Sequence, residues 1–163
     1  MTRAVRISEA RSGLSARFEL LDQLAPQSCA ALWALAQDAT PREALHAMWT
    51  GPELSCPLAA GDLPAAIDVT ALTLENAVRH PNAGELVLTV FDPGPIGPAR
   101  PFVDGGLDLG IFYGDGGRLL FPVGWIEGSL CARVSPEDLD GLASAARLIR
   151  RQGVCELQLE PIT

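Results

Sequence analysis

Lysine is absent from the 163-residue sequence, and all 12 of its basic residues are arginines. Without a lysine amine the chain cannot form a Schiff base with a carbonyl substrate or attach pyridoxal phosphate. Glycine clusters occur at 105–106 and 114–117, but neither is followed by the helix and lysine that a phosphate-binding loop requires. These glycines indicate hairpin turns, and we expect no cofactor.

Histidine and cysteine are also scarce, with two histidines and four cysteines in the whole chain. The cysteines stand far apart, at positions 29, 56, 131 and 155, and none belongs to a Cys-x-x-Cys pair. This spacing is not a zinc pattern, so we expect no metal site. We expect buried, reduced thiols, because the spacing shows no base or cation that would activate Cys56 or Cys131 as a nucleophile.

Positive charge is in deficit, since 20 acidic residues against 12 basic ones give a net charge of -8. Such a surface is repelled by nucleic-acid phosphates and by anionic lipid. No stretch reaches the roughly 18 consecutive apolar residues of a membrane span, and the N-terminal segment lacks the apolar core of a signal peptide. We therefore expect a cytoplasmic protein with no nucleic-acid partner and no membrane association.

Most of the chain consists of short segments in which apolar and polar residues alternate, which is typical of half-buried antiparallel strands. Residues 5–20 predict a hairpin with its turn at 11–13. Glycine, proline, asparagine or aspartate separates the later segments. The predicted strands after the hairpin are 43–49, 54–58, 85–91, 107–113, 126–134 and 155–159.

Two segments have the spacing of helices instead. One begins near Pro26 and ends before Pro41; the other begins after Ser135, as a capping residue, and stops at Gly153. The chain is thus expected to form a single domain over residues 1–163, mostly β with two helices. An open sheet or a sandwich is compatible with this order, but two helices among many short strands favour a closed antiparallel β-barrel whose ends the helices plug.

Several passages resemble the cyclophilin family. Residues 18–32 (FELLDQLAPQSCAAL) are similar to the cyclophilin passage in which a strand leads through a proline into the first helix, and residues 124–160 resemble its ending of Trp-Leu-Asp-Gly, strand, helix and strand. Residues 74–76 (LEN), 80–86 (HPNAGEL) and 111–114 (IFYG) resemble a bacterial branch of cyclophilin-like proteins described only as a domain of unknown function. The resemblance implies a closed cyclophilin-like antiparallel β-barrel and leaves the chemistry open.

The third predicted strand departs from the cyclophilin pattern. Cyclophilins carry Phe-His-Arg there, and the arginine donates hydrogen bonds to the twisting prolyl amide, whereas this sequence reads Leu45-His46-Ala47. The Gln-Gly-Gly-Asp and Ala-Asn-Ala-Gly passages of cyclophilins also have no counterpart. The resemblance therefore implies a barrel that is not a prolyl isomerase, with residual isomerase activity through other groups as a minor alternative.

The sequence suggests a ligand pocket near a rim of the barrel, where the long segments 59–71 and 92–106 are expected. Large aromatic side chains at strand ends would form an apolar wall for a small ligand, although core packing explains each of them singly. His46 titrates near neutral pH and is a candidate acid or base, with a structural role as the alternative. The predicted pocket residues are His46, Trp49, Ser55, Tyr113 and Trp125.

No catalytic residue is identified from the sequence, and whether the protein is an enzyme stays open. Glu75, Glu85 and Asp92 are possible acids and bases, but nothing in their spacing fixes their separation. We expect a small-molecule-binding protein or a cofactor-free enzyme that hydrolyses or rearranges an amide-bearing or cyclic metabolite. The alternative is a non-catalytic interaction or homo-oligomerising module that contacts its partner through the apolar loop 93–102.

Overall fold

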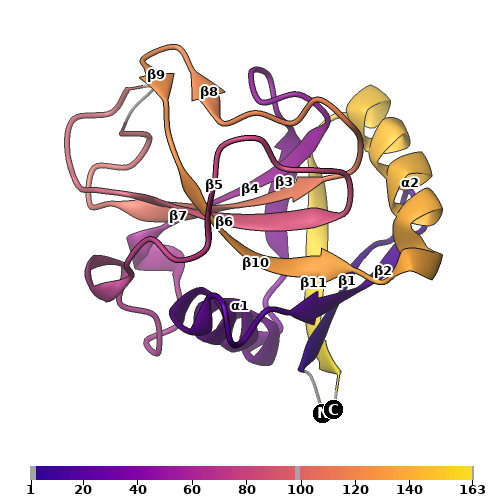
Figure 1. The fold of residues 1–163 in the computed structure, drawn as a ribbon, viewed down its shortest axis with the longest axis horizontal. Helices are drawn as coiled ribbons and strands as arrows, with labels where there is room; N and C mark the ends of the chain where they lie inside the picture. The colour runs from indigo at the N-terminus through magenta and orange to yellow at the C-terminus, as the bar shows by residue number, and fades with distance from the viewer. Residues whose placement is uncertain (1–2, 98–99, 163) are drawn as a thin grey trace.

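The computed structural model describes residues 3–97 and 100–162, and within them eight antiparallel strands close into a barrel (Figure 1). Their order around the barrel is β2-β1-β11-β3-β4-β7-β6-β10, and pairing of β10 with β2 closes the ring. The strands are β1 (Ala4–Glu9), β2 (Leu14–Leu20), β3 (Arg42–His46), β4 (Glu53–Ala59), β6 (Glu85–Phe91), β7 (Gly106–Phe112), β10 (Gly128–Val134) and β11 (Cys155–Ile162). The prediction of a closed barrel is confirmed.

Three shorter strands lie outside this ring. The strand β5 (Ala77–Val78) pairs with β10, and β8 (Leu120–Phe121) pairs with β9 (Gly124–Trp125) as a separate hairpin. In Figure 1 this hairpin lies beside the barrel, at the top of the view. None of the three was indicated by alternation in the sequence, because a two-residue strand is too short to show a period.

The two predicted helices are present as α1 (Pro26–Asp38) and α2 (Leu139–Gln152). Figure 1 shows them on different sides of the strands, and their buried residues belong to the same apolar cluster as the barrel interior. Leu32 and Ile149, one from each helix, are fully buried in that cluster. Neither helix, nor any other in the described ranges, has the length and apolarity needed to cross a membrane.

The start of α2 differs from the sequence prediction. Ser135 is followed by a 3-10 turn, η3 (Pro136–Asp138), and its side chain makes no capping hydrogen bond. The carboxylate of Asp138 instead accepts a hydrogen bond of 2.7 Å from the backbone N–H of Arg17 in β2. This acid therefore ties the helix entry to the barrel wall.

Strands β6 and β7 are buried on both faces, although their alternation predicts half-buried strands. The inward side chains join the barrel core, while Val87 and Phe112 point outward into a second apolar cluster with Leu119 and Leu130. Leu119 precedes the β8–β9 hairpin, so this segment covers the outside of the barrel. A second layer outside the strands is what makes an outward-facing pocket possible.

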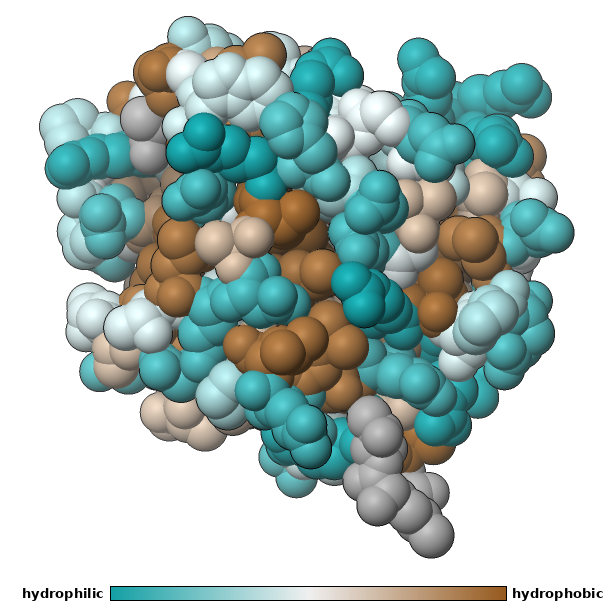
Figure 2. All heavy atoms as spheres, viewed as in Figure 1, coloured by the Kyte–Doolittle hydropathy of each residue, from teal (hydrophilic) through white to brown (hydrophobic). Residues whose placement is uncertain are grey.

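The segments predicted as long loops are partly ordered by short turns. Residues 60–71 contain two 3-10 turns, η1 (Ala60–Asp62) and η2 (Val69–Ala71). The segment between β6 and β7 carries four prolines, of which Pro98 lies outside the described residues. On the face shown in Figure 2, apolar side chains form separate patches between hydrophilic ones.

Candidate ligand site

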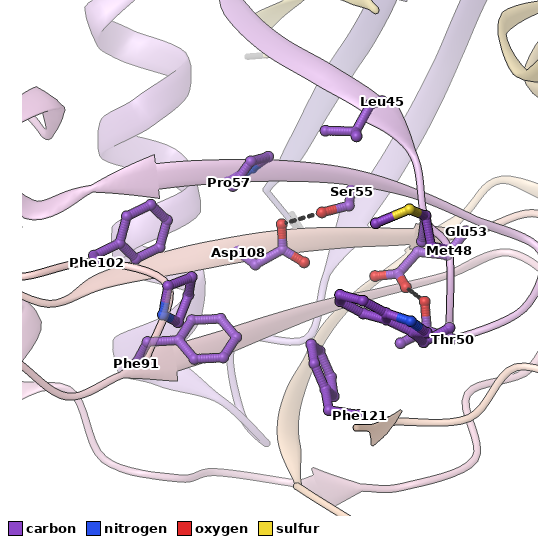
Figure 3. A pocket seen from close by; sticks show the side chains of 13 residues that line it. Leu45, Met48, Thr50, Glu53, Ser55, Pro57, Phe91, Phe102, Asp108 and Phe121 are labelled. Carbon is purple, nitrogen blue, oxygen red and sulfur yellow. Dashed lines mark hydrogen bonds between the residues drawn. The ribbon is translucent and has the colours of Figure 1, made fainter. Parts of the chain in front are cut away.

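A cavity of about 170 Å³ lies on the outer face of the barrel, against β4 and β7 (Figure 3). Its floor is polar and includes Thr50, Glu53, Ser55 and Asp108. The walls come from the turn after β3 and from the segments that cover the barrel. The aromatic residues of these walls are Trp49, Phe91, Phe102 and Phe121.

Strand alternation explains why the polar side chains point outward. In β4, Leu54 and Cys56 face the core, so Glu53 and Ser55 face the other side. In β7, Leu107 and Leu109 face the core, which leaves Asp108 on the outer face next to β4. Three polar residues from two paired strands thereby reach one patch of the barrel wall.

Asp108 is nine-tenths buried at the cavity floor. Burial raises the pKa of this carboxyl to about 6, because the charged form loses its hydration. Hydrogen bonds from the Ser55 hydroxyl, at 2.7 Å from Oδ1, and from the Cys56 backbone N–H oppose the rise in pKa. Asp108 therefore titrates close to neutral pH rather than near 4.

Glu53 is only 3% exposed and accepts a hydrogen bond from the Thr50 hydroxyl. Its burial and the negative charge of Asp108 raise its pKa well above the usual range of a glutamate, and the Thr50 hydroxyl opposes them. Glycine at position 110 leaves room for this carboxyl, since a Cβ there would collide with Oε1 of Glu53. Near neutral pH we therefore expect the pair to hold one proton, mostly on Glu53.

The aromatic side chains form a continuous row along the cavity. The ring centroids are 6.2 Å apart for Trp49 and Phe121, 6.1 Å for Phe121 and Phe91, and 6.2 Å for Phe91 and Phe102. These contacts hold the rings in tilted or edge-on arrangements that aromatic pairs favour. The result is an apolar enclosure over two acidic groups, which is the arrangement that separates an acid from a base in many enzymes.

Comparison with protein families identifies the chain. The model of a family described as a protein of unknown function, DUF3830, matches residues 7–160. The chain belongs to the DUF3830 family. A comparison with curated proteins gives no significant sequence match.

Solved structures of other proteins share the fold of this DUF3830 protein. McbB, solved in complex with tryptophan, has a TM-score of 0.62 at 16% identity, over 96% of this chain and 44% of McbB, so the chain spans less than half of that protein. A cyclophilin-type peptidyl-prolyl cis-trans isomerase of Cryptosporidium parvum has a TM-score of 0.54 at 14% identity, over 100% of this chain and 99% of the isomerase. The same isomerase in the presence of the dipeptide Ala-Pro gives 0.52 at 13% identity. The predicted cyclophilin-like barrel is confirmed.

Two of the five pocket residues predicted from the sequence, Trp49 and Ser55, line the cavity of the DUF3830 protein. Trp49 does so from a turn, because β3 ends at His46 rather than at residue 49 as predicted. Trp125 packs instead against His80, with ring centroids 5.0 Å apart, and is 49% exposed.

His46 and Tyr113 contact each other behind the cavity wall. Nδ1 of His46 lies 2.8 Å from the carbonyl oxygen of Ala47, which only accepts, so Nδ1 carries the proton and Nε2 accepts from the Tyr113 hydroxyl at 2.7 Å. Burial lowers the pKa of His46, the Ala47 carbonyl raises it, and the positive charge of Arg150 lowers it. His46 is thus a neutral imidazole that fixes the backbone carbonyl of Ala47, a cavity-lining residue.

The sequence did not indicate Glu53 and Asp108. A signal was present for Asp108, which is a lone charge in the apolar run 107–112 beside Gly110. A buried strand with one acid and one glycine indicates a close approach on that face. Glu53 has no comparable signal, because an acid at the start of a strand is normally solvated.

Two of the three acids that the sequence did suggest, Glu75 and Glu85, serve the fold of the DUF3830 protein. Glu75 accepts hydrogen bonds from the backbone N–H groups of Gln27 and Ser28, at 3.2 and 3.0 Å, and so caps α1. Glu85 pairs with Arg133 at 3.1 Å. Asp92 is exposed at the end of β6. These three carboxylates do not share a site.

The four cysteines are buried and unpaired, as predicted. Burial raises the pKa of Cys29 to about 12 and raises the pKa of each of the other three thiols. A thiol that stays protonated is a poor nucleophile. Among the described residues, no cluster of three or more His, Cys, Asp or Glu side chains is placed to hold a metal ion.

Proposed function

We propose that the cavity binds a small cyclic or amide-bearing metabolite and that Asp108 and Glu53 hydrolyse or rearrange it without a cofactor. One observation carries the proposal: two buried carboxyls with raised pKa values lie together at the floor of an aromatic cavity. A perturbed acid pair in a cleft is a common feature of catalytic sites. The net charge of -8 supports a small molecule over nucleic acid as the partner, and a cytoplasmic location stays a prediction.

The size of the cavity supports a ligand of about one ring. An apolar protein cavity of about 150 Å³ accommodates benzene, and this cavity measures about 170 Å³. Phe91 and Phe121 would contact the apolar body of the ligand, while its polar group would lie at Asp108 and Ser55. McbB, a structural neighbour, was solved with tryptophan, a small molecule with a ring and a nitrogen group, which supports a ligand of this kind.

In this mechanism Asp108 is the base and Glu53 is the acid. The carboxylate of Asp108 takes a proton from an attacking water, and the protonated Glu53 gives its proton to the departing nitrogen. A C–O bond forms as the C–N bond breaks, so one water is consumed and no oxidant or reductant is needed. Proton exchange with solvent then restores both carboxyls.

The other predicted pocket residues have supporting parts in the proposal. Trp49 and Ser55 contact the ligand, and His46 with Tyr113 holds the wall at Ala47. Trp125 lies opposite Leu120 in the β8–β9 hairpin, next to the cavity residue Phe121, and steadies that hairpin.

The same cavity argues against prolyl isomerase activity. Ala47, which stands where cyclophilins carry their arginine, offers only a methyl group to the cavity and donates no hydrogen bond to a prolyl amide. We expect a proline-peptide assay to give the uncatalysed rate, which corresponds to a time constant of roughly tens to hundreds of seconds at about 25 °C. A faster rate in the presence of the protein would contradict this part of the proposal.

The proposal is tested by a thermal-shift screen with lactams, cyclic imides and small aromatic amides, followed by mass-spectrometric detection of product. We expect at least one compound to raise the melting temperature, because a ligand that binds only the folded state stabilises it. Asp108→Asn should lose turnover while the matched variant Asp104→Asn, at an exposed aspartate, keeps it. Absence of any stabilising compound, or full turnover in Asp108→Asn, would overturn the proposal.

A further inference from the structure

The buried acids of this protein divide into two kinds. In the described part of the chain the buried carboxyls are Glu9, Glu53, Glu85 and Asp108. Glu9 pairs with Arg11 at 3.3 Å and Glu85 pairs with Arg133 at 3.1 Å. Within the same residues, neither Glu53 nor Asp108 forms an ion pair. The two acids without a cationic partner are the two that line the cavity.

A buried carboxylate without a cation is costly, which is why buried charges in proteins are normally paired. The hydroxyls of Ser55 and Thr50 supply hydrogen bonds to the two carboxyls but no positive charge. None of the described residues that line the cavity is an arginine or histidine. Among the described residues, no positive charge balances the Asp108 carboxylate, and a cationic ligand would supply it.

The cavity walls suit a cation as well. The faces of aromatic rings carry partial negative charge, and rows or cages of such rings bind ammonium groups by about 0.5–2 kcal/mol. Trp49, Phe91, Phe102 and Phe121 form such a row above the acids, and Figure 3 shows the carboxyls of Glu53 and Asp108 directed into the space beside the labelled rings. The net charge of -8 further attracts a cation to the molecule.

We propose that the ligand of this cavity is an organic cation, a protonated amine or substituted ammonium attached to a body of about one ring. Asp108 receives the ammonium group, and the aromatic row encloses the ring. This inference rests on the proposed function, because it assumes that the cavity is the ligand site. It makes a narrower claim, since the proposed function alone also permits a neutral lactam or imide.

Three probes of nearly equal size separate charge from shape: benzylammonium, benzyl alcohol and benzoate. We would titrate each into ¹⁵N-labelled full-length protein near pH 7.5 and follow the amide signals of residues around the cavity. Benzylammonium should bind about tenfold more tightly than benzyl alcohol, because a charge-assisted hydrogen bond in a buried site is stronger than a neutral one. Benzoate should not shift these signals.

Substitutions locate the effect at the acid pair. Asp108→Asn should weaken benzylammonium binding about tenfold and leave benzyl alcohol unchanged, because the amide keeps the shape and loses the charge. Glu53→Gln should weaken benzylammonium less, since this acid holds the shared proton. Asp104→Asn lowers the net negative charge by the same amount at an exposed site and should change nothing.

The outcomes separate this inference from the proposed function. Equal affinities for benzylammonium and benzyl alcohol at the cavity would contradict the proposal that the ligand is a cation, but not the proposal that the cavity is the ligand site. The cation proposal would also be wrong if benzoate bound more tightly than benzylammonium, or if benzylammonium shifted no signals around the cavity. An equal loss of benzylammonium affinity in Asp104→Asn and Asp108→Asn would contradict it as well. Turnover of a neutral lactam found in the earlier screen would support the proposed function alone.

Discussion

Asp108 lies in the middle of β7, between Leu107 and Leu109, and its carboxyl faces the outer cavity rather than bulk water. Its pKa is raised to about 6 by burial, whereas an aspartate in the unfolded chain titrates near 4. Between these two values the folded state binds more protons than the unfolded state, so this residue makes stability fall as pH rises. Above about pH 6 the full cost of the buried charge is present.

Asp108→Asn should remove this pH dependence. The unfolding free energy of the variant relative to wild type should rise by about 2 kcal/mol between about pH 4.5 and pH 8, because only wild type has to ionise the buried side chain. Urea denaturation at the two pH values measures the difference. A constant difference at both values would mean that Asp108 is solvated in the folded protein, and Asp104→Asn provides the exposed control.

At the level of elements, α1 depends on an acid that is distant in the sequence. The helix has Ala25 at its N-cap, which offers no capping side chain. The carboxylate of Glu75 replaces the cap by accepting from the N–H groups of Gln27 and Ser28 and from the Ser28 hydroxyl, at 3.1 Å. This satisfies donors that a helix start leaves open and places a negative charge at the positive end of its dipole.

Glu75→Ala should lower the unfolding free energy by about 1–2 kcal/mol, the usual cost of losing an N-terminal cap. Glu75→Gln should cost less, because an amide oxygen still accepts a hydrogen bond but carries no charge. Chemical denaturation followed by circular dichroism gives both values. Glu156→Ala, at an exposed position of β11, should have little effect; an equal loss there would show that the cap is not the cause.

At the level of the whole molecule, closure of the barrel brings the first and last strands together. β1 pairs antiparallel with β11, and Ala4 lies opposite Ile162. The long-range pairs that close the ring, such as Phe18 with Val134, join distant parts of the sequence. Integrity of the ring therefore depends on which strands neighbour each other in space rather than on the order in which the chain visits them.

A circular permutant tests this property. Joining the two ends by a short flexible linker and opening the chain at Gly61, an exposed residue outside the barrel strands, should leave a cooperatively unfolding protein with the same circular dichroism spectrum. Opening the chain at Gly110 should prevent folding, because β7 is hydrogen-bonded on both edges, to β4 and β6. Failure of the first permutant, or success of the second, would contradict the closed barrel.

The sequence by itself determined the long strands and both helices, while the resemblance to cyclophilins indicated the closed barrel. Alternation of apolar and polar residues marked the long strands, and proline and glycine marked the ends of both helices, because these signals act within a few residues. Ala47 in place of an arginine was also readable from the sequence, and so were the inert cysteines. The boundary of β3 was not, since Met48 and Trp49 continue an extended pattern until the turn at Gly51 interrupts it.

Only the tertiary structure decided where the site lies. Ser55 and Asp108 are 53 positions apart, and they meet because β4 and β7 become neighbours when the barrel closes. An outward-facing acid on a barrel is normally solvated, and the lone charge in the apolar run 107–112 does not reveal which segments cover it. Phe102 and Phe121 come from segments that fold over the outside of the wall and line the same cavity as Asp108, whose pKa is raised by burial. The raised pKa of Asp108 therefore depends on the barrel wall and the segments that cover it, which come together only in the folded protein.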